Sequence, residues 1–157
     1  MKVIGLTALV ALLLDQLSKW VVLSVLKLDD VGDIKVLPPF VNFHMAWNKG
    51  VNFGLFGNDS AVMPYILTAL ALVICGAVLW WLRRSTDWRA QVSAGLLIGG
   101  AIGNSIDRLR FGAVADFLNM SCCGIENPYA FNVADIAIFL GAVGLIIWGD
   151  ARSRKER

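Results

Sequence analysis

The stretch VIGLTALVALLLDQLSKWVVLSVL, from Val3 to Leu26, decides the class of fold. It is apolar almost throughout, and a helix that rises about 1.5 Å per residue crosses a bilayer core with about 20 such residues. An apolar run after Lys2 is also compatible with a signal peptide. The polar interruption Asp15-Gln16-Leu17-Ser18-Lys19 and the lack of a clear small-residue cleavage site favour a membrane span.

Three more stretches have the same character, so the predicted spans are 3–26, 61–82, 91–108 and 130–148. Hydrophobic residues make up 57% of the 157 residues and charged residues only 17%, which is more apolar surface than a small soluble domain can bury. We predict a membrane all-α protein with four transmembrane helices, forming a single domain over residues 1–157. The net charge of +2 and the lack of basic runs interleaved with aromatics argue against nucleic-acid binding.

The distribution of positive charge predicts the orientation. Basic residues precede the first span, separate the second from the third, and follow the fourth: Lys2; Arg83, Arg84 and Arg89; Arg152, Arg154, Lys155 and Arg157. The positive-inside rule places these three regions in the cytoplasm. Both termini are therefore expected inside, and the loops 27–60 and 109–129 outside.

The two outer loops are expected to form a small β-sheet on the outer face of the helices. Partial alternation of apolar and polar residues over Val41–Trp47 predicts a strand or hairpin, and Phe111–Phe117 has a similar pattern. Three cysteines, of which Cys122 and Cys123 are adjacent, make a poor disulfide framework. With His44 as the only histidine, no metal site is predicted.

Polar residues within the predicted spans are functional candidates, because ionisable groups are costly in lipid. Asp15 and Lys19 are four residues apart and can pair. The pair is compatible either with fixing helix packing or with forming a polar wall of an active-site cavity. Further along, glycines at four-residue spacing predict close approach of another helix: Gly95, Gly99 and Gly103.

The third span ends with Asn104, Asp107 and Arg108. Asp107 and Arg108 are compatible with a simple ion pair at a helix end. An arginine at the outer rim is also suited to hold a lipid phosphate, because its planar guanidinium binds oxyanions in two places.

Asp135 is expected about six residues inside the fourth span, where no basic residue in the rest of the span neutralises it. Asp116, in the short outer loop, is the candidate partner, although an ordinary solvated carboxylate is the alternative for it. Two carboxylates at close range share a proton, so one takes a proton from water while the other donates to a carbonyl oxygen. A serine–histidine arrangement is doubtful with a single histidine. The hypothesis from the residues is an aspartic-peptidase dyad.

Five short motifs resemble, in order and spacing, those of the lipoprotein signal peptidases, also called signal peptidase II. They cover nearly the whole chain: Asp15-Gln16-Leu17-Ser18-Lys19 (D-Q-x-[ST]-K), Asn48-Lys49-Gly50-Val51-Asn52-Phe53 (N-x-G-x-x-F), Gly99 to Arg108 (G-G-A-x-G-N-x-x-D-R), Val114-Ala115-Asp116-Phe117 (V-x-D-F) and Phe131-Asn132-Val133-Ala134-Asp135 (F-N-x-A-D).

The resemblance implies an enzyme of the bacterial cytoplasmic (inner) membrane that removes the signal peptide of diacylglyceryl-modified prolipoproteins, just before the lipidated cysteine. It implies Asp116 and Asp135 as the catalytic pair near the outer face, with no metal or cofactor, and a monomer whose partners are diacylated prolipoproteins and membrane lipid. It further implies two sets of site residues. Substrate-binding residues are expected at Asn48, Gly50, Asn104, Arg108 and Asn132, and supporting residues at Asp15, Lys19, Asp107 and Ala134.

Two departures from the family pattern concern loops. Val51 and Asn52 stand where the family commonly has small alanines, and the stretch from Met120 to Asn127, with Cys122 and Cys123, is longer and richer in cysteine than expected. Two other classes of protein stay open from the residues alone. One is a transporter or assembly factor whose buried carboxylates carry protons or ions, and the other is an enzyme that acts on the lipid itself.

Overall fold

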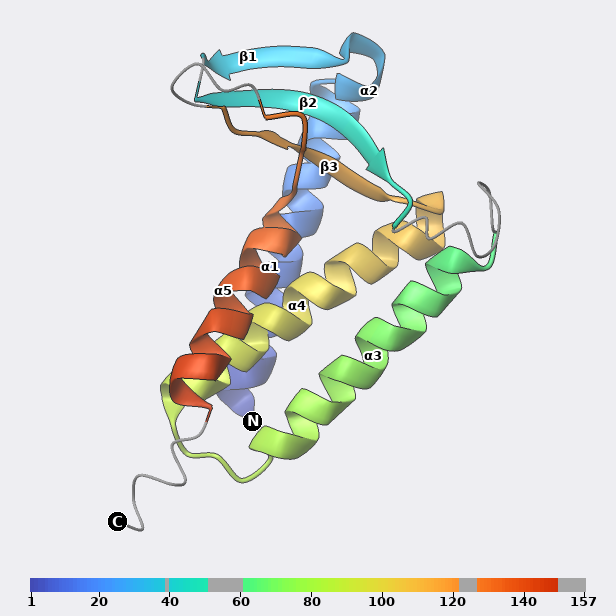
Figure 1. Cartoon of the computed structure of the whole chain (residues 1–157). Helices are drawn as coiled ribbons and strands as arrows, with labels where there is room; N and C mark the ends of the chain where they lie inside the picture. The colour runs from blue at the N-terminus through green and yellow to red at the C-terminus, as the bar shows by residue number, and fades with distance from the viewer. Residues whose placement is uncertain (39, 51–60, 122–126, 150–157) are drawn as a thin grey trace.

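The computed structural model describes residues 1–38, 40–50, 61–121 and 127–149, and shows a helix bundle with a small sheet at one end (Figure 1). The helices are α1 (Lys2–Trp20), continued by the π-helical segment η1 (Val21–Val25), then α2 (Leu28–Val31), α3 (Met63–Leu82), α4 (Trp88–Phe111) and α5 (Val133–Trp148). The strands are β1 (Asp33–Leu37), β2 (Val41–Asn48) and β3 (Val114–Asn119).

Helix α4 is the centre of the bundle and packs against α1, α3 and α5. Its glycines allow this close packing. A Cβ on Gly99 would collide with the carbonyl oxygen of Ala8 in α1, and one on Gly100 would meet the carbonyl oxygen of Ala134 in α5. The packing role predicted for the glycine stripe is confirmed, and α1 is the helix that approaches it.

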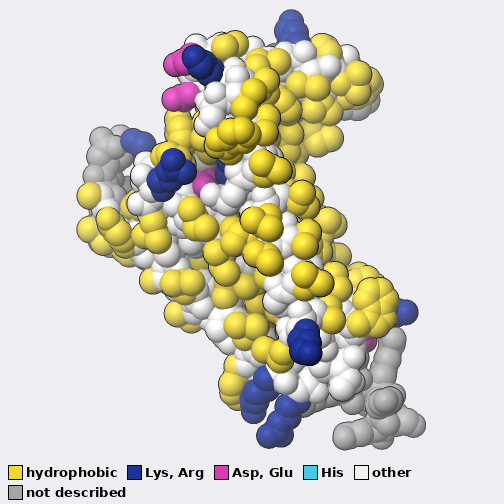
Figure 2. All heavy atoms as spheres, turned by 180° about the vertical axis from the view of Figure 1, so that it is seen from behind, with side chains coloured by type: hydrophobic (Ala, Val, Ile, Leu, Met, Phe, Trp, Pro, Cys, Tyr) yellow, Lys and Arg dark blue, Asp and Glu magenta, His cyan; other side chains and the backbone are white. Residues whose placement is uncertain are grey.

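On the face that Figure 2 shows, apolar side chains cover most of the bundle, whereas charged side chains gather toward its two ends. Among the described residues, two helical segments are long and apolar enough to cross a membrane, Lys2–Val25 and Met63–Leu82. Helix α5 is apolar but has only 16 residues, and α4 contains several buried polar residues. The count of four spans therefore stays a prediction.

The predicted limits of two spans were wrong for local reasons. Helix α4 begins at Trp88 because the Asp87 side chain caps it, accepting from the backbone N–H of Arg89 at 2.8 Å. It ends where Gly112 adopts a left-handed conformation, with φ of 73°. Helix α5 begins at Val133 rather than at residue 130, because Asn132 is its N-cap.

The sheet is antiparallel in the order β1-β2-β3 and lies across one end of the bundle (Figure 1). Strand β2 confirms the prediction for Val41–Trp47. The prediction for Phe111–Phe117 was wrong at its start, because Phe111 still belongs to α4 and β3 begins at Val114. Under the sheet, the rings of Phe43 and Phe117 meet edge to face at 5.8 Å between centroids.

The register of β2 and β3 brings two predicted site residues, Asn48 and Asp116, to one end of the bundle. Asp116 lies opposite Ala46, and Asn48 lies opposite Val114. Asp116 is thereby brought toward the ends of α4 and α5 that face the sheet. The expectations for Val51, Asn52, Phe53, Cys122 and Cys123 lie outside the described residues.

We expect Gly99→Ala to destabilise the protein, because the added methyl group must displace the α1 backbone and overpacking costs about 1–3 kcal/mol. Gly76→Ala in α3 is the matched control, since no atom lies within 4 Å of the position that its Cβ would take. Thermal unfolding in detergent should show a lower midpoint for Gly99→Ala alone. Equal midpoints for the two variants would contradict the packing role of Gly99.

Candidate active site

Asp116 is buried at the start of β3, with only 3% of its surface exposed. Its two carboxylate oxygens accept hydrogen bonds from two amide side chains. Oδ2 accepts from Nδ2 of Asn48 at 3.0 Å, and Oδ1 accepts from Nδ2 of Asn132 at 2.6 Å. The carboxylate is therefore held between β2 and the start of α5.

Asp135 lies in the first turn of α5, where it forms a capping box with Asn132. The Asp135 N–H donates to Oδ1 of Asn132 at 3.0 Å, and Oδ2 of Asp135 accepts from the Asn132 N–H at 3.1 Å. Because α5 begins at Val133, Asp135 is the N3 residue of the helix, and its depth in the membrane stays a prediction. The carboxylate lies at a helix N-terminus, where the helix dipole favours negative charge.

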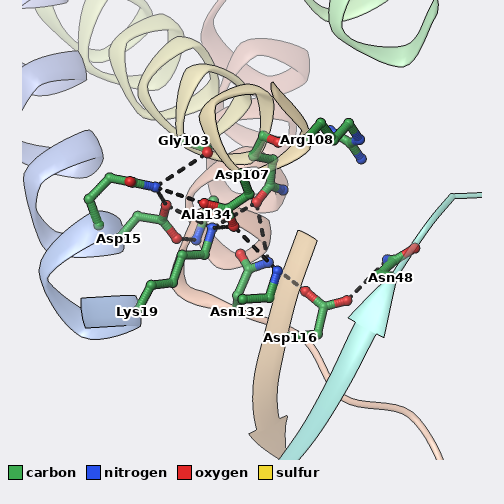
Figure 3. A network of polar contacts seen from close by, with 12 residues as sticks. Asp15, Lys19, Asn48, Gly103, Asp107, Arg108, Asp116, Asn132 and Ala134 are labelled. Carbon is green, nitrogen blue, oxygen red and sulfur yellow. Dashed lines mark hydrogen bonds and ion pairs between the residues drawn. The ribbon is translucent and has the colours of Figure 1, made fainter. Parts of the chain in front are cut away.

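Two buried amides connect the carboxylates (Figure 3). Asn132 donates from Nδ2 to Oδ1 of Asn104 at 3.2 Å as well as to Asp116. Asn104 in turn donates from Nδ2 to Oδ1 of Asp135 at 2.8 Å. The chain Asp116–Asn132–Asn104–Asp135 is therefore continuous, and the structure brings together the two aspartates that the sequence analysis paired.

Lys19 is buried beneath this chain and binds three side chains (Figure 3). Its ammonium nitrogen lies 2.9 Å from Oδ2 of Asp15, 2.7 Å from Oδ2 of Asp107 and 3.1 Å from Oδ1 of Asn104. The predicted pair of Asp15 and Lys19 forms, and it underlies the site. Asp107 uses Lys19 as its ion-pair partner rather than the neighbouring Arg108.

The pKa of Asp116 is raised from 3.8 to about 6. Burial is the largest cause, and the nearby charge of Asp135 acts in the same direction. Hydrogen bonds from Asn48 and Asn132 and the charge of Lys19 act in the opposite direction. Desolvation is the larger effect because Asp116 is almost completely buried. The Asp116 carboxyl therefore keeps a proton to higher pH than an ordinary aspartate does.

The remaining predicted site residues lie around this chain. Asn48 is exposed, and its Oδ1 accepts from the N–H of Gly50, whose φ of 92° suits glycine. Arg108 extends away from Lys19 (Figure 3), with Nη1 3.4 Å from the Asn104 carbonyl oxygen. Its Nε is buried and has no hydrogen-bond partner among the described residues. Ala134 donates its N–H to Oδ1 of Asp15 at 3.0 Å.

The sequence analysis missed one residue of the network. Gln16 places Nε2 3.1 Å from Oδ2 of Asp15, 3.1 Å from Oδ1 of Asp107 and 3.3 Å from the Gly103 carbonyl oxygen. Gln16 belongs to the polar interruption of the first span, which was the available signal. A neutral amide carries no charge to demand a partner, so the pattern did not single it out.

Comparison with known proteins shows the family of the chain. A family model described as signal peptidase (SPase) II matches residues 7–149. The chain is 42% identical over 144 residues to a lipoprotein signal peptidase of Rhodopseudomonas palustris, covering 90% of this chain and 87% of that protein. It is 39% identical over 146 residues to one of Polynucleobacter necessarius, covering 92% and 86%.

Two solved structures, each described as a bacterial membrane enzyme determined by the in meso method, have the same fold. The structure at 2.3 Å resolution superposes with a TM-score of 0.77 at 25% identity, covering 100% of this chain and 93% of the other. The structure at 1.9 Å gives 0.78 at 26% identity, covering 94% and 92%.

The fold and the matches together define a membrane peptidase. The chain belongs to the signal peptidase II family, the lipoprotein signal peptidases, as its motifs predict. This family is of the aspartic type. Membership decides against the transporter and against the enzyme acting on lipid alone.

We expect the effect of Asp116→Asn on stability to depend on pH. A carboxyl whose pKa is raised in the folded protein costs no stability below its ordinary pKa of 3.8; the cost grows as pH rises from there to the folded pKa of about 6 and is constant above it. The variant lacks this cost, which is roughly 1–3 kcal/mol for a shift of about two pKa units. Its unfolding midpoint relative to wild type should rise between about pH 4 and pH 6 and then stay level at higher pH.

The matched control is Asp30→Asn, which changes an exposed carboxylate on α2. Its midpoint relative to wild type should change little over the same range. A constant difference between Asp116→Asn and wild type would contradict the raised pKa of Asp116.

Proposed function

We propose that this protein is a membrane aspartic endopeptidase that removes the signal peptide from diacylglyceryl-modified prolipoproteins, cutting just before the lipidated cysteine. Family membership supports the substrate class. The single observation that supports the chemistry is the hydrogen-bonded chain that joins Asp116 to Asp135 through two asparagine side chains.

In the proposed mechanism, ionised Asp135 takes a proton from a water molecule while that water attacks the scissile carbonyl carbon. Protonated Asp116 donates its proton to the carbonyl oxygen. The tetrahedral intermediate then collapses. Asp135 passes its proton to the leaving amine as the C–N bond breaks, and one hydroxyl of the intermediate returns a proton to Asp116 as the carboxyl group of the product forms. The dyad itself activates the water, so the mechanism uses no metal or cofactor.

The two environments support this division of roles. Asp116 is buried on β3, with its pKa raised to about 6, which suits the group that holds the proton. Asp135 is less buried and lies at a helix N-terminus, which favours negative charge there. Environments that differ in this way separate an acid from a base in a pair of carboxylates.

The proposed placement has four spans, both termini in the cytoplasm, and the sheet at the outer face of the inner membrane. The support is the charge at the other end of the bundle. Arg83 and Arg84 follow α3, and Arg89 lies in the first turn of α4, at the end of the bundle opposite the sheet (Figure 1). The dyad would then lie near the outer rim, where a lipidated cysteine keeps its acyl chains in the bilayer.

Among the residues proposed to bind substrate, Arg108 has the most freedom to do so. The buried Nε of Arg108 has no partner among the described residues, which leaves a donor for a peptide carbonyl or a lipid oxygen. Asn104 and Asn132 direct their amide donors to Asp135 and Asp116, so we propose that they hold the dyad as well as border the substrate. The proposed partners are diacylated prolipoproteins and membrane lipid, with the enzyme acting as a monomer and binding no nucleic acid.

We expect Asp116→Asn and Asp135→Asn each to abolish cleavage of a diacylated precursor, because an amide cannot exchange the proton that the mechanism requires. The measurement is the rate of signal-peptide release by the purified protein in detergent. Asp30→Asn is the control and should cleave at the wild-type rate. Normal cleavage by Asp135→Asn would disprove the dyad assignment.

We also expect a strong chelator of divalent metals to leave the cleavage rate unchanged, because two carboxylates sharing a proton can activate water alone. The assay compares rates before and after dialysis against the chelator. Loss of activity that returns when a divalent metal is added would contradict the proposed mechanism.

A further inference from the structure

Each proposed catalytic aspartate follows an alanine whose backbone N–H is held by a buried carboxylate. The N–H of Ala115, just before Asp116, donates to Oδ2 of Asp107 at 3.3 Å. The N–H of Ala134, just before Asp135, donates to Oδ1 of Asp15 at 3.0 Å. The two carboxylates therefore hold the backbone immediately beside the two aspartates of the dyad.

Both of these carboxylates bind the same ammonium group, that of Lys19, at 2.9 Å for Asp15 and 2.7 Å for Asp107. The side chains are almost completely buried, with exposed fractions of 4% for Lys19, 0% for Asp15 and 2% for Asp107. Because a buried ion pair is costly to separate, neither carboxylate can move freely away from Lys19. The shared cation thus fixes the separation of the two backbone segments.

Gln16 completes the same unit without adding a charge. Its Nε2 contacts Oδ1 of Asp107, the oxygen that Lys19 and Ala115 leave unused, and Oδ2 of Asp15. It also contacts the carbonyl oxygen of Gly103, where a Cβ would collide with Asp15. Gln16 therefore ties the two carboxylates to each other and to the α4 backbone.

We propose that Asp15, Gln16, Lys19 and Asp107 form a clamp that sets the separation and orientation of the catalytic aspartates, as positioning residues for cleavage. The inference rests on the proposed function, since it assigns Asp116 and Asp135 the catalytic role. It goes further by stating how three helices and a strand are held so that the carboxylates stay close despite their mutual repulsion.

A role in stability alone predicts a different outcome from a role in positioning. Loss of stability lowers the amount of folded enzyme, so the pH profile of kcat keeps its shape. A loosened clamp lets the two carboxylates move apart, which weakens the repulsion that raises the upper pKa of the pair. The alkaline limb of the kcat profile then moves to lower pH.

The decisive variant is Gln16→Met, because it removes the amide contacts while keeping the length of the side chain and the net charge. The charged groups near Asp116 are Asp135 from α5, Lys19 from α1 and Arg108 from α4, and Asn48 of β2 adds an uncharged amide; this variant changes none of them. We expect kcat on a diacylated precursor to fall about 10-fold or more, because a 1 Å misplacement can cost on the order of 10²-fold. KM should stay within about twofold, and the alkaline limb should move to lower pH.

Two substitutions of Lys19 test the same unit through its cation. Lys19→Met should reduce kcat more strongly, and Lys19→Arg should recover part of that loss because it restores the cation. Ser105→Ala is the matched control. Ser105 is buried on the same helix as Asp107, two residues earlier, but its hydroxyl donates only to the Ala101 carbonyl oxygen. It should leave kcat and the pH profile unchanged.

The clamp is overturned if Gln16→Met lowers only the unfolding midpoint and leaves kcat per folded molecule and the pH profile at wild-type values. If Lys19→Met does not fold, Gln16→Met still decides the question. Cleavage by Asp116→Asn and Asp135→Asn separates this failure from that of the proposed function. Active dyad variants reject the function, whereas inactive dyad variants beside a normal Gln16→Met reject the clamp alone.

Discussion

The buried ammonium group of Lys19 is the interaction on which the rest of this structure depends. It is bound by Asp15 and Asp107, so two negative charges meet one positive charge in a place with almost no solvent. The excess negative charge is stabilised by donors, namely two backbone N–H groups and the amide of Gln16. A charge cluster in a low-dielectric bundle is stable only with such partners, so the same requirement holds together α1, α4, β3 and α5.

The asparagine pair forms a second layer between this cluster and the dyad. Asn104 accepts from Lys19 on one side and donates to Asp135 on the other, and Asn132 donates to Asp116 while capping α5. Amides suit this position because they do not titrate. The number of protons on the two aspartates can therefore change without altering the charge of the residues that hold them.

The sequence predicted more of the site than of its geometry. Apolar runs identified α1 and α3, and the polar residues that interrupt the apolar stretches identified most members of the network. The start of α5 at Val133 could not be predicted, because a regular apolar run does not reveal that Asn132 would cap the helix with its side chain. Nor does a local pattern reveal contacts such as that of Asp15 with Ala134, which are 119 residues apart. Motif order supplied the pairing of the aspartates that spacing alone left open.

The glycines of α4 show how packing and chemistry depend on one another. The stripe was predicted as a surface for helix packing, and Gly99 confirms that role against α1. Four residues further on, Gly103 occupies the same stripe, but a side chain there would collide with the Asp15 carboxylate. The close approach of α1 to α4 is therefore what allows Asp15 and Lys19 to reach Asp107 and Asn104 on α4. At the end of the bundle that faces the sheet, the same helix interface supports the proposed catalytic pair.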